Sequence, residues 1–285
     1  MNLNVRDTAL RELMDDPQCD PDRLDATLRR FGTVNRLVSG WGGVYRTHLR
    51  PHLAGLGRPA RVLDLGCGGG DLVGRLAGLA RRDGLRVEWL GVDPDPRAHA
   101  VARTRERDDV RFRCTDSTAL RAEGERFDAV VSNHVLHHLS PQELADFTAD
   151  SRELSTGPVL HADIARGRLA YGLYAVGIAP LAPGTFLHTD GLRSIRRSYR
   201  ADELQRALEP ADAARAAASG AETRGGTGAG GAGAGGAGGA GATSGAHGAE
   251  GAGAASGAHG AEGTRVWRVE SPAPFRLLAR STGRA

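Results

Sequence analysis

Residues 62–70 read Val62-Leu-Asp-Leu-Gly-Cys-Gly-Gly-Gly70, an apolar run that contains one acid and ends in a turn of glycines. Glycine adopts backbone conformations that other residues avoid, and it lets backbone N–H groups approach a ligand closely. Residues 71–82 follow with the apolar spacing of a helix, whose N-terminus attracts negative charge. A strand, a glycine turn and a helix in this order predict a cofactor site on an α/β sheet.

The glycine spacing distinguishes between two kinds of cofactor. The dinucleotide fingerprint G-x-G-x-x-G, counted from Gly66, requires glycine at position 71, where this sequence has Asp71. The pattern present is Asp64-x-Gly66-x-Gly68-x-Gly70. A nicotinamide-dependent oxidoreductase is therefore disfavoured.

Short apolar segments alternate with helical ones along the middle of the chain. The predicted strands are 61–65, 87–92, 110–114, 127–132 and 158–164, and the predicted helices are 71–82, 96–107 and 141–154. Ser140 can cap the last helix, Pro141 suits its first position, and Glu143 can close a capping box. The alternation predicts a parallel sheet with helices on both faces.

The remaining segments complete the predicted organisation. Residues 219–264 are almost wholly Gly, Ala, Ser, Thr, His and Glu, and such a segment has too little to bury for an ordered fold. Its repeated SGAHGAEG offers His and Glu, but a flexible loop holds a metal poorly, so no metal site is predicted. The predicted units are a helical cap at 1–53, a core at 54–218, a disordered loop at 219–264 and a C-terminal strand pair at 265–285. The core includes a substrate-side insertion at 166–199, predicted as a long loop, and a helix at 201–218.

Composition and charge disfavour several function classes. The net charge is +3, acids are interspersed among the arginines, and no basic helix is present, so no nucleic-acid partner is predicted. The three cysteines are too few and too scattered for a disulfide framework, which fits a cytoplasmic location, and the acidic N-terminus does not predict a signal peptide. Residues 169–187 lack charge, but Pro180 and Pro183 would break a spanning helix. We therefore expect weak lipid contact at most, without stable membrane insertion.

Three further motifs follow the glycine turn in order. Gly91-Val-Asp93-Pro94-Asp95 ends the second strand, where a carboxylate can accept hydrogen bonds from ribose hydroxyls, and Asp93 is the better candidate because Asp95 fits the next helix start. Residues 114–117 read Cys-Thr-Asp-Ser after the third strand. Residues 127–139 read FDAVVSNHVLHHL around the fourth.

Together the four motifs resemble class I S-adenosyl-L-methionine (SAM)-dependent methyltransferases, of the small-molecule type found in ubiquinone and menaquinone biosynthesis and polyketide tailoring. The resemblance implies a Rossmann-like seven-stranded α/β sheet, mostly parallel with an antiparallel C-terminal strand, under an N-terminal helical cap. It also implies SAM as cofactor. The residues that it assigns to SAM are Asp64, Gly66, Cys67, Gly68 and Gly70 for the amino-acid part, Asp93 and Pro94 for the ribose, Asp116 and Ser117 for the adenine, and Asn133 beneath the methionine.

In such folds the acceptor lies beyond the ends of the fourth and fifth strands. His134 is the first candidate for a general base and His188 the second, because histidine titrates near neutral pH. The uncharged, aromatic-bearing insertion favours a small aromatic or lipophilic acceptor and O-methylation. The residues predicted to contact that acceptor are Asp163, Tyr171, Arg193 and Arg197.

Other functions remain open from the sequence alone. A C-methyltransferase acting on a quinone-type ring and a non-catalytic SAM-binding module are both compatible with the same motifs. N-methylation of a macromolecule is disfavoured, because residues 132–135 read Ser-Asn-His-Val where such enzymes carry an NPPY-type tetrapeptide.

Deletion of residues 219–264 is expected to leave the fold and the cofactor affinity unchanged, because the segment contributes no apolar surface to a core. Thermal unfolding and calorimetric titration with SAM check this. A deletion variant that folds but no longer binds SAM contradicts it.

Overall fold

The computed structural model describes residues 2–209 and 266–283. The predicted disordered loop at 219–264 lies outside the described residues, as does the C-terminal half of the helix predicted after residue 200. Residues 201–209 are helical.

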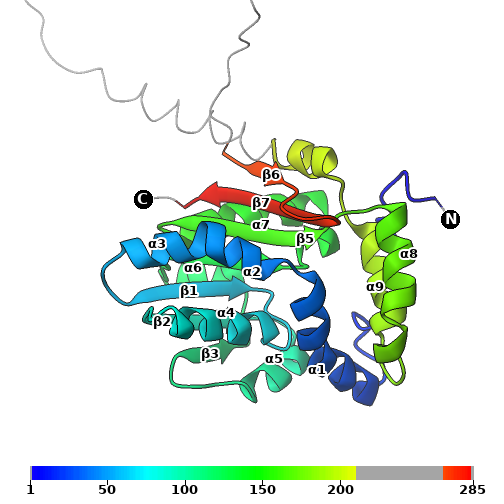
Figure 1. Ribbon diagram of the computed structural model, residues 1–285, viewed down its shortest axis with the longest axis horizontal. Coiled ribbons are helices and arrows are strands. Elements are labelled where there is room, and N and C mark those ends of the chain that lie inside the picture. The colour runs from blue at the N-terminus through cyan, green and yellow to red at the C-terminus, as the bar shows by residue number, and fades with distance from the viewer. Residues whose placement is uncertain (1, 210–265, 284–285) are drawn as a thin grey trace, which may run out of the picture.

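A seven-stranded sheet forms the centre of the described chain, in the order β3-β2-β1-β4-β5-β7-β6 (Figure 1). The strands β1 to β5 are parallel, and β7 runs antiparallel to β5 and to β6. This confirms the predicted fold class. The strands are β1 Ala60–Leu65, β2 Val87–Val92, β3 Val110–Arg113, β4 Ala129–Asn133, β5 Pro158–Ile164, β6 Arg268–Glu270 and β7 Arg276–Thr282.

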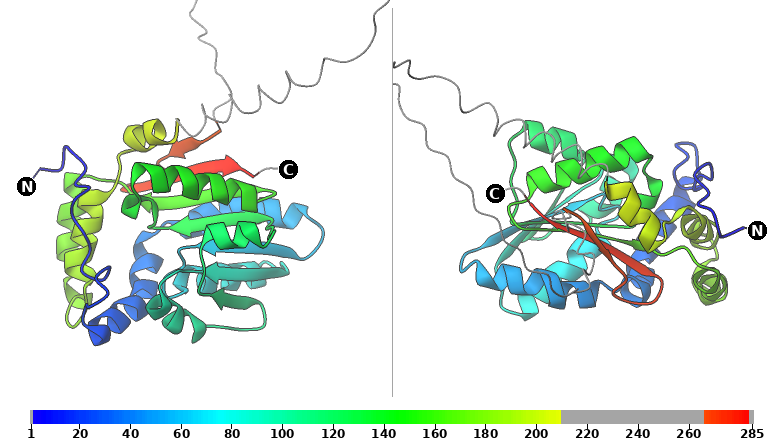
Figure 2. Two further views of the ribbon diagram at one scale, coloured as in Figure 1. Left: turned by 180° about the vertical axis from the view of Figure 1, so that it is seen from behind. Right: turned by 90° about the horizontal axis from the view of Figure 1, so that it is seen from above.

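Helices cover both faces of the sheet (Figure 2). One apolar cluster joins Val62 to α2, α3 and α4, and a second joins Leu63 and Leu65 to α6 and α7. Because successive side chains of a strand point to opposite faces, the uninterrupted apolar run of β1 supplies both layers. These helices are α2 Trp41–Val44, α3 Arg50–Gly55, α4 Asp71–Arg82, α5 Pro96–Arg103, α6 Ser117–Ala122 and α7 Pro141–Leu154.

The capping box predicted for α7 is present in the structure. Ser140 accepts from the Glu143 N–H and the Glu143 side chain accepts from the Ser140 N–H, which is the predicted capping box of α7. Near the N-terminus, Asp20 caps α1 (Pro21–Val38), and Gly40 takes a left-handed φ of 68°. That turn separates α1, which packs on α4 and α5, from α2 on the sheet.

The long loop predicted after β5 is wrong. The segment contains α8 Arg168–Gly177, a short 3-10 turn Ala179–Leu181 and α9 Leu187–Arg197 (Figure 1). Pro180 and Pro183, which predict a helix break, fall between α8 and α9, and Gly172 and Gly191 are tolerated within the two helices. The six-residue helix α6 was also missed, because six residues show too little periodicity.

Other differences are small. The helix predicted at 96–107 ends at Arg103, where the Thr104 hydroxyl bonds the carbonyl of Val101. Among the described helices, none is long and apolar enough to cross a membrane.

Gly70→Ala is expected to destabilise the fold by ~1–3 kcal/mol, because its φ is 76° and an added Cβ would lie 2.5 Å from Cζ of Phe112. Gly74→Ala is the matched control: Gly74 lies inside α4 with nothing within 4 Å of its Cβ position. It should stabilise by ~0.4–1 kcal/mol. Denaturant unfolding measures both, and equal effects would refute the close-approach argument.

Candidate cofactor and acceptor site

The glycine turn is held tightly to the neighbouring strand. The backbone N–H groups of Gly66 and Cys67 both donate to the carbonyl of Val92, at 2.9 and 3.0 Å. Gly66 and Gly68 have φ values of 70° and 52°. A Cβ on Gly66 would lie 2.6 Å from Cγ2 of Val135, so this position requires glycine.

Asp64 lies buried at the start of the turn without a partner. Among the described residues, none hydrogen-bonds to either carboxylate oxygen. Burial raises the pKa of Asp64 well above its usual value, and the charges of Asp71 and Asp93 raise it further. A cationic ligand group placed beside Asp64 would relieve both effects, and an ammonium group fits this requirement.

Asp93 lies at the end of β2, across the glycine turn. Its Oδ2 accepts from the Gly68 N–H at 2.9 Å and its Oδ1 accepts from the Asp95 N–H at 2.9 Å. Burial raises its pKa, and these two hydrogen bonds oppose the rise. Each carboxylate oxygen retains a further lone pair. Asp95 caps α5 and pairs with Arg97, as the sequence indicated.

Pro94 and the acids after β3 lie on neighbouring loops. The carbonyl of Pro94 accepts from the Cys114 thiol at 3.6 Å, which places the two loops in contact. Asp116 is exposed and caps α6 through the Ala119 N–H, while the Ser117 hydroxyl donates to Asp150 at 2.7 Å. The structure thus gives both predicted adenine contacts a role in starting α6.

Asn133 and His134 follow β4. The Oδ1 of Asn133 accepts from the indole N–H of Trp41 at 3.0 Å, which holds the helical cap over the end of β4. His134 has a left-handed φ of 61°, and its N–H donates to the carbonyl of Ala162. Burial lowers the pKa of His134 to about 3, against the opposing charge of Asp163. The imidazole is therefore neutral at pH 7, and the low pKa makes it a weaker base than the near-neutral histidine that the sequence suggested.

Asp163 is committed to protein partners. Its Oδ1 accepts from Nδ1 of His137 at 2.7 Å, and its Oδ2 accepts from the His137 N–H at 3.0 Å. The opposite ring nitrogen of His137 lies 3.3 Å from Oε1 of Glu12, which also accepts from the Ser194 hydroxyl. This buried network was not predicted from the sequence, because Glu12 is remote from β4 and β5 along the chain.

The network separates the pKa values of its members. Burial lowers the pKa of His137, but Asp163 and Glu12 outweigh it and raise the value to about 9. Burial acts to raise the pKa of both carboxyl groups, yet the histidines and hydrogen bonds hold each at about 2. At neutral pH a buried imidazolium thus lies between two carboxylates.

The other predicted acceptor residues lie on α8 and α9. His188 is exposed, and Tyr171 is half-buried. Arg193 donates to the carbonyl of Arg11 at 2.6 Å, and Arg197 donates to the carbonyls of His137 and His138. The two arginines therefore tie the N-terminal segment and the turn after β4 to α9.

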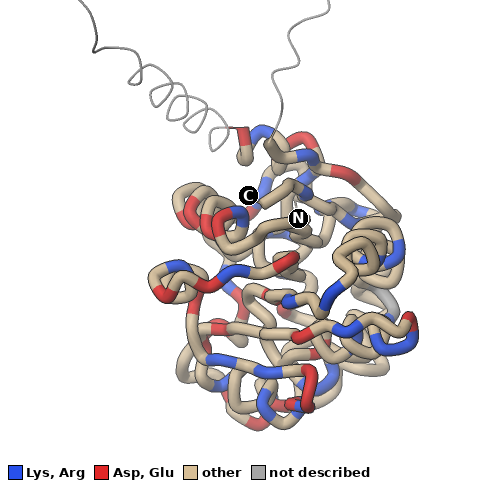
Figure 3. The backbone as a smooth tube through the Cα atoms, turned by 90° about the vertical axis from the view of Figure 1, so that its left-hand side faces the viewer, with Lys and Arg blue, Asp and Glu red and all other residues tan. Residues whose placement is uncertain are grey.

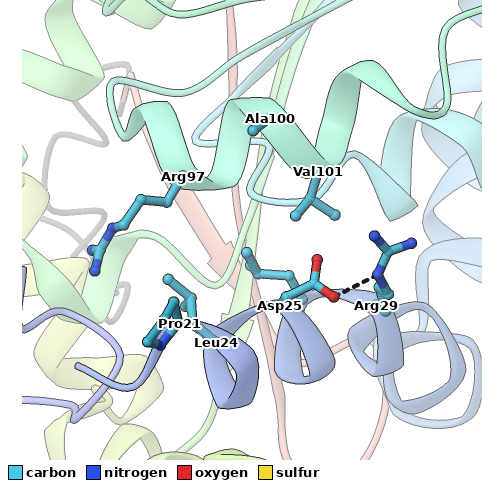
Figure 4. Close-up of a pocket in the computed structure, with 8 residues that line it drawn as sticks. Pro21, Leu24, Asp25, Arg29, Arg97, Ala100 and Val101 are labelled. Atoms are coloured by element: carbon cyan, nitrogen blue, oxygen red, sulfur yellow. Dashed lines mark hydrogen bonds and ion pairs between the residues drawn. The ribbon is translucent and has the colours of Figure 1, made fainter.

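A surface pocket of about 300 Å³ lies between α1 and α5 (Figure 4). It contains none of the residues predicted for cofactor or acceptor. The lining residues are Pro21, Leu24, Asp25, Leu28, Arg29, Arg97, Ala100 and Val101.

The glycine turn lies in a segment that matches a known protein family. Residues 62–155 match the family described as "Methyltransferase domain". The matched segment runs from the third residue of β1 to the residue after α7, and so includes the glycine turn, Asp93, Asp116 and His134.

Curated methyltransferases also match part of the chain. The ubiquinone biosynthesis O-methyltransferase of Brucella ovis is 30% identical over 155 residues, which cover 53% of this chain and 59% of the relative. That of Cereibacter sphaeroides is 36% identical over 103 residues, covering 35% and 39%. The chain thus spans about six-tenths of the length of the Brucella relatives that it matches.

Solved methyltransferase structures match the chain at low identity and with TM-scores below 0.5. The DhpI–SAH complex is 15% identical with a TM-score of 0.45, covering 93% of this chain and 100% of that one. The magnesium protoporphyrin IX methyltransferase of Synechocystis with bound SAH is 13% identical with a TM-score of 0.43, covering 94% and 90%.

The free energy of unfolding is expected to fall as the pH rises from 7 through about 9, because the pKa of His137 is raised on folding. Stability from a raised pKa is complete below the unfolded value of about 6.5 and is lost above the folded value, here by about 3 kcal/mol at most. Glu12→Gln should flatten this fall, since it removes one of the charges that raise the pKa.

Denaturant unfolding between pH 6 and pH 10 measures the effect. Glu270→Gln, which breaks an exposed ion pair with Arg280, is the control and should keep the wild-type slope. A Glu12→Gln slope equal to that of the wild type would contradict the assignment.

Proposed function

We propose that this protein transfers a methyl group from SAM to a small aromatic or lipophilic acceptor, with oxygen as the favoured acceptor atom. The unpartnered, buried carboxylate of Asp64 at the start of the glycine turn carries the proposal. In a methyltransferase domain that position fits the ammonium group of SAM. The similarity to ubiquinone biosynthesis O-methyltransferases supports a small-molecule acceptor.

The proposed cofactor contacts follow from the site. Asp64 would hold the ammonium group, the turn from Gly66 to Gly70 would pack against the amino-acid part, and Asp93 would accept from the ribose hydroxyls. SAM, when bound, supplies an electrophilic methyl group on a sulfonium. The protein then has to align the acceptor and exclude water.

The position of His134 at the end of β4, where the acceptor is expected, favours oxygen as the acceptor atom. Its low pKa makes it a weak base, so it would take the proton as the phenolic oxygen is methylated and becomes strongly acidic, and not before. His188 is the weaker candidate because its side chain is exposed to water. Methylation of a ring carbon remains the alternative, in which a base removes a ring proton.

We also propose that the protein acts in the cytoplasm without a nucleic-acid partner. The three cysteines are free, and Figure 3 shows acidic and basic residues interspersed on the face that it presents. Such a mixture lacks the extended basic surface that the phosphates of nucleic acids require.

Calorimetric titration of the whole chain with SAM, with NAD as the control ligand, tests the cofactor. We expect micromolar binding of SAM and none of NAD. A folded protein that does not bind SAM would refute the proposal, and SAM binding without turnover of any phenol or quinol would favour a non-catalytic module.

Asp93→Ala is expected to weaken SAM binding by ~1–3 kcal/mol, because the ribose hydroxyls lose their acceptor. Asp109→Ala is the matched control, since Asp109 forms an exposed ion pair with Arg81 away from the glycine turn. The same titration compares the variants, and an unchanged affinity in Asp93→Ala would move the ribose contact elsewhere.

A further inference from the structure

Arg276 lies at the acceptor end of the sheet. It is the first residue of β7 and pairs with Ile164, the last residue of β5, so it lies at the edge where the parallel strands end. Its charge acts on both Asp163 and His134. A Cβ on Gly40 would lie 3.9 Å from its Cγ, so the side chain passes beside the turn between α1 and α2.

The guanidinium group of Arg276 has no hydrogen-bond or ion-pair partner within the described residues, although the side chain is half-buried. Burial lowers its pKa, and Asp163 opposes this only in part. Asp163 itself is occupied by His137 and by the N–H of Ile164. A partly dehydrated cation with five free donors is unfavourable unless an anion binds to it.

Neighbouring arginines differ from Arg276 in this respect. Arg6 donates to the carbonyls of Arg197 and His137 and to the hydroxyl of Tyr199. Arg166 pairs with Glu203, and Arg197 bonds the turn after β4. Arg193 and Arg197, which the sequence predicted to contact the acceptor, thus bond backbone carbonyls of the protein. Within the described residues, the donors of Arg276 have no such partner.

The backbone beside Arg276 is strained. Within the described residues, His134 and Phe275 are the non-glycine residues with positive φ, at 61° and 64°. His134 follows β4, and Phe275 directly precedes Arg276. A hydrogen bond from the Ala165 N–H to the Phe275 carbonyl holds the backbone in place where β7 begins. Such conformations persist where the surrounding structure imposes them, and they cluster at ligand sites.

We propose that Arg276 binds a carboxylate group of the methyl acceptor, so that the acceptor is an aromatic or lipophilic acid rather than a neutral phenol. This rests on the proposed function. A guanidinium group matches a carboxylate with two parallel N–H donors, which fixes the orientation of the acceptor as well as its affinity. The hydroxyl to be methylated would then face His134.

SAM also carries a carboxylate, so the experiment must separate the two sources. The probes are 3,4-dihydroxybenzoate and catechol, which differ only in the carboxylate. Each is titrated calorimetrically into the whole chain, alone and saturated with S-adenosylhomocysteine, and SAM is titrated in parallel. The variants are Arg276→Gln, Arg276→Lys and the control Arg280→Gln, whose arginine lies on the same strand in an exposed ion pair.

We expect the wild type to bind the acid at least about tenfold more tightly than catechol, and Arg276→Gln to lose this preference while its SAM affinity stays unchanged. Arg276→Lys should retain part of the preference, because it keeps the charge but not the paired donors. Arg280→Gln should behave as the wild type. If Arg276→Gln does not fold, the reduced preference of Arg276→Lys is the test.

Three results would overturn the proposal. One is a wild type that does not prefer the acid, including one that binds neither probe. Another is an Arg276→Gln protein that keeps the preference. The third is an Arg276→Gln protein that loses affinity for SAM alone, which would assign Arg276 to the cofactor carboxylate. Binding of the acid by a protein that does not bind SAM would keep the Arg276 site and refute the methyltransferase function instead.

Discussion

The two hydrogen bonds from Gly66 and Cys67 to the carbonyl of Val92 are the constraint on which the candidate site depends. They join the ends of β1 and β2 at one point, so the turn has to leave β1 in a left-handed conformation that glycine alone adopts without strain. The Gly68 N–H then meets Asp93, and the acids of the two strands come to lie on either side of one turn.

A second set of contacts closes the acceptor end. The N-terminal segment reaches across the sheet and places Glu12 against His137, while Arg6 and Arg197 bond the carbonyls of the turn after β4. The free-energy cost of burying these charges is offset by their pairing with one another. The N-terminal segment can therefore pack in one position, the one in which the charges are paired. Within the described residues, the same packing leaves the Arg276 side chain without a partner near His134. Two of the unpaired polar groups thus lie where a cofactor and an acceptor would bind: Asp64 beside the glycine turn and Arg276 at the end of the sheet.

Local patterns were enough to predict the parallel core. The capping box of α7 lies within four residues, and β2 and β5 are short apolar runs bounded by turn residues, so their bounds agree with the prediction. The helices α8 and α9 were missed because glycine and proline suggest breaks, whereas packing against the N-terminal segment stabilises helices there. Arg193 and Arg197 were predicted to contact the acceptor because they form a cluster of arginines in the sequence. The sequence does not show which carbonyl groups lie near them, and in the structure both donate to backbone carbonyls. Arg276 was overlooked for the converse reason, since it is one of many arginines until the pairing of β7 with β5 places it.

The sequence by itself determined the order of the parallel strands, the glycine turn, and the acids at the ends of the first three strands. These depend on the conformational preferences of neighbouring residues, which are written within a few positions of one another. Only the tertiary structure decided which charged groups are satisfied, because Glu12, His137, Asp163 and Arg276 come from segments far apart in the chain. Whether a buried charge has a partner depends on distances across the fold. That property separates Arg6, Arg166 and Arg197, which bond other parts of the described fold, from Arg276, whose donors have no partner there.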